Sequence, residues 1–187
     1  MLDSEALLGL DPIMAGIEGF ATELAVGVLH YASHQQLTDT AVALRAMAAR
    51  LESMLLQVVH KVDVTSSYAA EGLLGPVPWL RMHTRMAPAE AGRCVRTAKA
   101  LASGTLDATA AALAAGQIDP AHAHAIAAGV KDAPAGAVAL IEPEALAAAR
   151  EADPRAVSEV MARFAHALDP DDADAAALRR LERRGGG

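Results

Sequence analysis

The chain has 187 residues, of which 53% are hydrophobic and only 3% are aromatic, so its apolar content is chiefly alanine, leucine and valine. A chain of this length can bury a substantial core. The composition is typical of closely packed helices and leaves few aromatic residues for strands. The formal net charge of −7 argues against a general nucleic-acid coat, because binding to phosphates depends on clustered cations.

The N-terminal region has no pattern of export or membrane insertion. Asp3 and Glu5 stand where a signal peptide carries positive charge, and Glu18 and Glu23 interrupt the one long apolar stretch. A single cysteine, Cys94, fits a reducing compartment. We therefore expect a cytoplasmic protein without membrane contact.

A long helical pair is predicted for residues 1–67. Asp11-Pro12 is a typical helix start, and apolar residues every three or four positions predict a helix over 12–32. A second helix is predicted over 38–62. It carries a heptad seam of five apolar residues, namely Leu44, Met47, Leu51, Met54 and Val58. We interpret the seam as a contact within one chain. A coiled coil between two chains is the alternative, although the flanking positions lack the charge pairs typical of one.

Glycine and proline mark residues 68–78 as a connection between two lobes. Trp79, which follows it, is interpreted as a core anchor, because surfaces that stack bases usually present several aromatic rings. We expect a lobe of short helices over 79–170 and a polar tail or linker over 171–187.

The predicted helix over Pro88–Leu101 has one apolar face and one cationic face. Arg93, Arg96 and Lys99 lie on the cationic face, and Arg81 and Arg85 precede it in the chain. These five cations are accompanied by one acid, Glu90. They are the candidate nucleic-acid-binding residues, although an ordinary solvated face is the alternative.

Two further short helices are predicted over 106–115 and 120–130, and together with the basic helix they resemble a helix-turn-helix unit in outline. The segment 120–130 contains no arginine, lysine, asparagine or glutamine with which to read base edges. Any contact with DNA is therefore expected to be with phosphates.

His122 and His124 raise the question of a metal site. Asp119 is predicted to cap a helix that begins at Pro120, and Gly116 to end the helix before it. Two histidines that are two residues apart on a helix point to nearly opposite faces, so they cannot bind one metal ion together. The sequence has no C-x-x-C or H-E-x-x-H motif. We predict neither a metal nor another cofactor.

Towards the C-terminus, Glu142-Pro143 is predicted to start a helix that ends near Glu151, and Asp153-Pro154 to start the next. The stretch from residue 142 to residue 174 contains nine acids and three arginines. The chain is therefore electrically polarised, with a basic segment followed by an acidic one.

Three runs in this order resemble the domain of unknown function 222, or 13E12 repeat, family of actinobacterial proteins. They are "PWLRMHTRMAPAEAGRCVRTAKAL", "ATAAALAAGQIDPAHAHAIA" and "ADPRAVSEVMARFAHALDPDDAD", and the resemblance extends from about Leu37 to Asp174. The residues on matching family positions are Trp79, Leu80, Glu90, Arg93, Arg96, Gly116 and His122. Members frequently carry a C-terminal HNH nuclease domain with metal-binding histidines. This sequence has no histidine or cysteine after Asp174 and no asparagine at all.

These observations predict an all-α bundle of about six to eight helices, with a long N-terminal pair and shorter helices after it. The resemblance implies a non-catalytic helical module of an HNH-endonuclease-associated protein, and the cationic face of the predicted helix suggests that this module contacts DNA phosphates. The alternative is a protein-interaction or homo-oligomerisation module with no nucleic-acid role. An independent enzyme is the third reading. It is the least favoured of the three, because no set of catalytic residues can be assembled from local spacings. Nuclease activity is expected only where a C-terminal nuclease domain follows.

Overall fold

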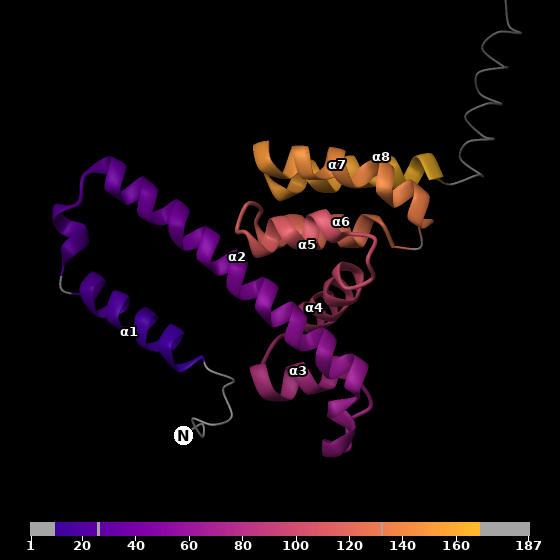
Figure 1. Cartoon of the computed structure of the whole chain (residues 1–187), viewed down its shortest axis with the longest axis horizontal. Helices are drawn as coiled ribbons and strands as arrows, with labels where there is room; N and C mark the ends of the chain where they lie inside the picture. The colour runs from indigo at the N-terminus through magenta and orange to yellow at the C-terminus, as the bar shows by residue number, and fades with distance from the viewer. Residues whose placement is uncertain (1–9, 26, 132, 169–187) are drawn as a thin grey trace, which may run out of the picture. The chain divides into compact units, whose positions relative to one another are not determined.

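The structure is a computed structural model that describes residues 10–25, 27–131 and 133–168. These residues form α-helices and two short 3-10 helices, with no strand among them, so the predicted all-α class is confirmed (Figure 1). The α-helices are α1 (Asp11–Ala25), α2 (His34–Thr65), α3 (Pro76–Thr84), α4 (Pro88–Leu101), α5 (Asp107–Ala114), α6 (Pro120–Gly129), α7 (Ala135–Glu151) and α8 (Pro154–Leu168). The tail expected over 171–187 lies outside the described residues. No helix in the described part of the chain is both long and apolar enough to cross a bilayer.

The chain divides into two compact units, Met1–Leu44 and Arg45–Gly187, and the boundary falls inside α2. The connection expected over 68–78 lies within the second unit.

In the first unit, Gly27 adopts a left-handed conformation with φ of 90° between α1 and the 3-10 helix η2 (Val28–Tyr31). A residue in this conformation cannot continue a right-handed helix. The single helix expected over 12–32 is therefore wrong.

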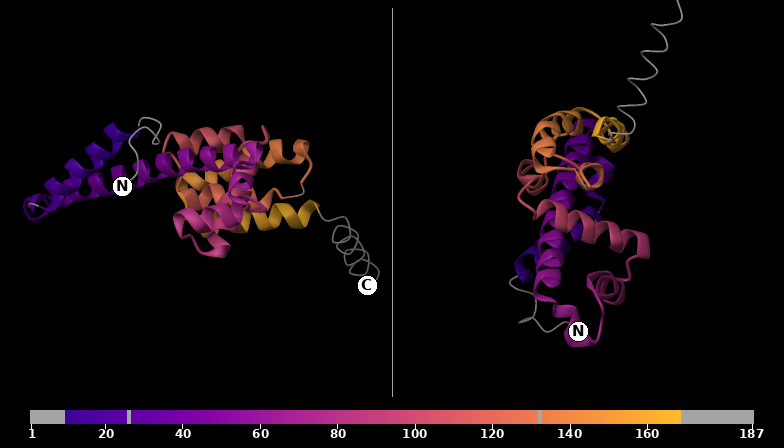
Figure 2. Two further views of the ribbon diagram at one scale, coloured as in Figure 1. Left: turned by 90° about the horizontal axis from the view of Figure 1, so that it is seen from below. Right: turned by 90° about the vertical axis from the view of Figure 1, so that its right-hand side faces the viewer.

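The helices of the second unit are stacked in layers. In Figure 1, α7 and α8 lie side by side, α5 and α6 lie beneath them, and α4 and then α3 follow. The right-hand view of Figure 2 shows the same order, with the orange and yellow helices on one side of the pink ones. The 3-10 helix η3 (Ser67–Glu71) joins α2 to this stack.

Helix α6 lies at the centre of the second unit, in contact with α4, α5, α7 and α8. Its buried residues include Ala123, Ile126 and Ala127, so small side chains let the neighbouring helices approach. The closest approach is at Gly129, where an added Cβ would lie 2.4 Å from the Cβ of Met161 on α8. Only glycine fits at this crossing without displacing α8.

The second half of α2 buries a different face from the one expected. The residues that it buries are Ala49, Ser53, Leu56, Val59 and Val62. The predicted seam is exposed, with exposed fractions from 39% at Leu44 to 54% at Met47. The expected burial of this seam within one chain is therefore wrong. The seam gave the stronger sequence signal because it is apolar at every heptad position, whereas the buried face also includes Ala49 and Ser53.

Helix α7 begins at Ala135, well before the predicted start at Glu142-Pro143, and contains Pro143 in its interior. That predicted start is wrong, because Glu142 accepts hydrogen bonds from a different helix, α5. Its Oε1 atom accepts hydrogen bonds from the backbone N–H and the hydroxyl of Thr109, both at 2.8 Å. Glu142 and Thr109 are both buried, and the carboxylate satisfies an N–H in the first turn of α5.

The predicted start of α8 is confirmed. Asp153 Oδ1 accepts the backbone N–H groups of Arg155 and Ala156 at 2.9 and 3.0 Å, as an N-cap does. Val157 and Met161 of α8 are buried in the core, so this face of the helix packs against the rest of the second unit.

Candidate functional site

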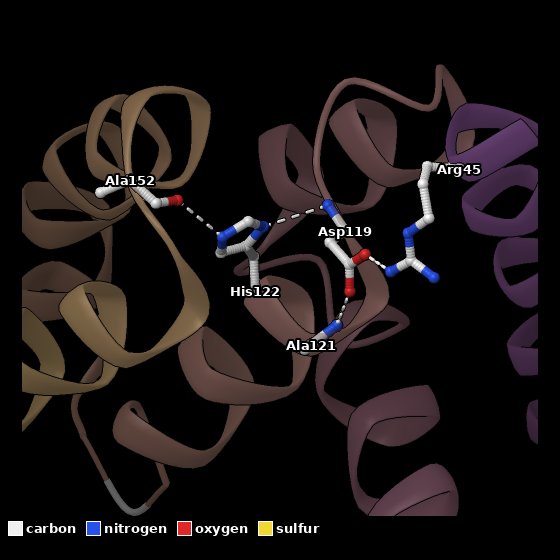
Figure 3. A network of polar contacts seen from close by, with 5 residues as sticks. All are labelled: Arg45, Asp119, Ala121, His122 and Ala152. Atoms are coloured by element: carbon white, nitrogen blue, oxygen red, sulfur yellow. Dashed lines mark hydrogen bonds and ion pairs between the residues drawn. The ribbon is translucent and has the colours of Figure 1, made fainter. Parts of the chain in front are cut away.

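The start of α6 is fixed by a network of polar contacts (Figure 3). Asp119 Oδ1 accepts the N–H of Ala121 at 2.9 Å, and the N–H of Asp119 donates to His122 Nδ1 at 3.1 Å. Because Nδ1 accepts, the proton of the neutral ring lies on Nε2, which donates to the carbonyl of Ala152 at 3.0 Å. Arg45 of α2 forms an ion pair with Asp119. The capping box thus ties α6 to α2 and to the end of α7.

The two histidines of α6 point to different neighbours, as their spacing predicts. His122 uses both ring nitrogens in the network described above, whereas His124 Nδ1 lies 2.8 Å from Thr97 Oγ1 of α4. Within the described part of the chain, no three histidine, cysteine, aspartate or glutamate side chains are grouped so that they could hold a metal ion.

A cavity of about 460 Å³ lies between α4 and α6. Its lining residues are Arg93, Arg96, Thr97, Lys99, Ala100, Ser103, Thr105, His124, Ala127, Ala128, Val130 and Lys131. Among the described residues, this lining includes four cations and no carboxylate, in a chain whose net charge is −7. A concave site with this lining favours anions, because the cations act together and low-dielectric walls focus their field.

Three of the five cations predicted as phosphate contacts line this cavity. Arg93, Arg96 and Lys99 are exposed while Cys94 and Val95 are buried, so the predicted division of α4 into two faces is confirmed. Lys99 is already paired with Asp63, with its Nζ atom 3.0 Å from Oδ2. Neither Arg93 nor Arg96 lies within ion-pair distance of a carboxylate among the described residues. The two arginines are therefore the cations most available to an incoming anion.

Arg81 and Arg85 do not line the cavity. Arg81 is exposed in the last turn of α3, and Arg85 ends that helix in a left-handed conformation with φ of 59°. The structure thus separates them from the cavity formed by α4 and α6. Their role as phosphate contacts stays a prediction.

Sequence reasoning missed the residues that α6 contributes to the cavity. His124, Ala127, Ala128 and the following Lys131 lie on one face of the α6 segment, because they are three or four residues apart. On α4, Arg93, Arg96, Thr97 and Ala100 follow the same spacing. The helical spacing in the sequence predicts each of the two stripes. It does not predict that the stripes face each other, because that contact joins residues far apart in the chain.

Burial, and secondarily the nearby guanidinium of Arg93, hold the pKa of His124 below its ordinary value. The imidazole of His124 is therefore neutral at pH 7. Thr97, its hydrogen-bond partner, is only 2% exposed. The wall of the cavity thus contains an uncharged polar pair in addition to the cations and the alanines.

Cys94 lies on the buried face of α4 and is unsuited to act as a nucleophile. Burial, with further contributions from Glu52 and Glu90, raises its pKa to about 11. The thiol is therefore protonated at neutral pH, and the thiolate is the reactive form of cysteine.

The sequence profile of the family described as "Domain of unknown function (DUF222)" matches residues 38–185, which is most of the chain. The chain belongs to the DUF222 family. The suspected family resemblance is thus confirmed. Neither the curated proteins nor the solved structures include a significant match.

The lowered pKa of His124 predicts how stability depends on pH. The unfolded chain protonates this histidine below about pH 6.5, whereas the folded chain resists protonation until a lower pH. His124 should therefore contribute a loss of unfolding free energy as the pH falls below about 6.5. Urea unfolding at pH 7.5, 6.5 and 5.5 should give a shallower decline for His124→Gln than for the wild-type protein. Parallel declines would contradict this assignment.

Proposed function

We propose that this DUF222 domain is a non-catalytic helical module that binds DNA through its phosphates, at the cavity between α4 and α6. The observation that carries the proposal is the lining of that cavity, which has four cations and no carboxylate among the residues that the structure describes. The two exposed arginines, Arg93 and Arg96, supply bidentate donors that match phosphate oxygens.

The expected contact is insensitive to base sequence. Helix α6 presents alanines and His124 to the cavity, and none of the α6 residues from Pro120 to Gly129 is arginine, lysine, asparagine or glutamine. Those side chains make the common contacts with base edges in the major groove. Phosphate contacts without base contacts position a protein on DNA but do not select a sequence.

The family resemblance suggests the biological setting of such a module. Its relatives frequently carry an HNH nuclease domain after the helical part, so we propose that the module holds DNA for a nuclease on the same chain or on a partner. The nuclease would cut, and the DUF222 domain would supply affinity. This division of work requires no catalytic residue in the helices.

Salt dependence tests the DNA-binding proposal. With roughly three to five phosphate contacts, the slope of log K against log salt should be about −3 to −4.5. The double variant Arg93→Ala/Arg96→Ala should flatten the slope by about 1.8, because each neutralised phosphate contributes about 0.9. Fluorescence anisotropy with a labelled duplex, started at about 20 mM salt, measures both slopes and stays in the range where phosphate contacts are strong.

A matched control separates a local effect from a change in net charge. The double variant Arg155→Ala/Arg163→Ala removes the same charge from exposed positions on α8. It should retain nearly the slope of the wild-type protein. Equal slopes for the wild-type protein and the Arg93/Arg96 variant, or no binding by the wild-type protein at low salt, would overturn the proposal.

A second candidate function is self-association through α2, and one specific observation favours it. The seam residues Met47, Leu51, Met54 and Val58 of the second unit are 42–54% exposed, although they follow a heptad spacing. Exposed apolar rows of this kind are typical of contact surfaces. A second copy of the chain carries the same row and would bury it symmetrically.

Replacing Leu51 with glutamate tests this second candidate. If the seam joins two copies, Leu51→Glu should raise the dimer dissociation constant by roughly tenfold or more, because burying an unpaired charge is costly. The helices should stay folded, since Leu51 lies outside the core. Val64→Glu, on an exposed position of α2 away from the seam, is the control. Sedimentation velocity that finds the wild-type protein monomeric at all concentrations would exclude the dimer.

A further inference from the structure

The cavity between α4 and α6 is larger and less polar than a phosphate requires. Behind the cations its wall is formed by Ala100, Ala127, Ala128 and Val130, and its volume is about 460 Å³. Ligand sites are typically cavities of about 300–1,000 Å³ that combine apolar walls with a few polar groups. A phosphate at the arginines would leave this apolar wall facing water, so the cavity has room for a further part of the ligand.

The polar groups in the wall suit a neutral, flat group with hydrogen-bonding edges. The Nδ1 atom of His124 is engaged by Thr97 at 2.8 Å, and Nε2 makes no hydrogen bond with a described residue. Because its lowered pKa keeps the ring uncharged, His124 offers a flat face and one hydrogen-bonding nitrogen. Nucleobases stack on such rings and present donors and acceptors at their edges.

We propose that this cavity binds one nucleoside monophosphate unit, with the phosphate at Arg93 and Arg96 and the base against His124, Ala127 and Ala128. The inference rests on the proposed function, because the same two arginines serve both. It adds that one base enters the cavity, which a duplex cannot offer without extruding a nucleotide. Single-stranded DNA should therefore bind more tightly than a duplex of equal length.

A variant that fills the cavity separates the base from the phosphate. Ala128 is exposed on the rim, so Ala128→Phe places a ring in the cavity without entering the core. Ala147→Phe, at an exposed position of α7 that does not line the cavity, is the matched control. Thermal melting checks that both variants fold, and Ala128→Leu is a smaller second blocker.

The measurement is fluorescence anisotropy of the full chain with a labelled single-stranded thymidine oligonucleotide and with a duplex. Ala128→Phe should weaken binding of the single strand roughly tenfold more than binding of the duplex, whereas Ala147→Phe should change neither. Competition with thymidine monophosphate, thymidine and inorganic phosphate identifies the unit that binds. The monophosphate should displace the single strand at a lower concentration than either thymidine or phosphate.

The failures of the two proposals are distinguishable. If the duplex binds in an Arg93- and Arg96-dependent manner but Ala128→Phe and Ala128→Leu match Ala147→Phe on the single strand, the base-binding inference is overturned and the phosphate proposal stands. Equal competition by monophosphate and inorganic phosphate also overturns the inference. If the wild-type protein binds neither nucleic acid nor the monophosphate, both proposals fail. If the monophosphate alone binds, the cavity takes a free nucleotide and DNA binding fails.

Discussion

The second unit depends on how closely its helices can approach α6. Gly129 admits Met161 of α8 where any Cβ would collide, and this contact brings α8 against one side of α6. On another side, Ala127 and Ala128 are too small to fill the space towards α4, and the cavity is what remains. The same small residues therefore create a tight contact on one face of the helix and an open site on another. The capping box at Asp119 fixes where the helix starts.

Charge gives this cavity its chemical character. The chain is acidic overall, yet four cations and no carboxylate line the cavity in the part of the chain that the structure describes. One of these cations, Lys99, already has a partner in Asp63, so Arg93 and Arg96 dominate its attraction for anions. Burial keeps the imidazole of His124 neutral, so this ring adds polarity to the wall without adding charge. Cationic side chains and space for a less polar group thus coexist in one cavity.

Local signals in the sequence predicted the features that depend on neighbouring residues. The cap at Asp119, the start of α8 and the two faces of α4 follow from residue type and helical spacing. The features that depend on distant partners were missed. Glu142 resembles a helix start but accepts a backbone N–H of α5, and the apolar seam of α2 lies on a different face from the residues that are buried. Thr97 and His124 meet across two helices, which no spacing within either helix reveals.

The most direct test of the central claim is to map where nucleic acid contacts the protein. We would record ¹H–¹⁵N correlation spectra of the full chain while adding a short single-stranded oligonucleotide. Our account predicts the largest shifts at amides around the cavity, namely Ser103, Thr105, Ala128 and Lys131, with little change along Met47–Val58 of α2. Shifts confined to α2, or no shifts around the cavity at a saturating concentration, would contradict it.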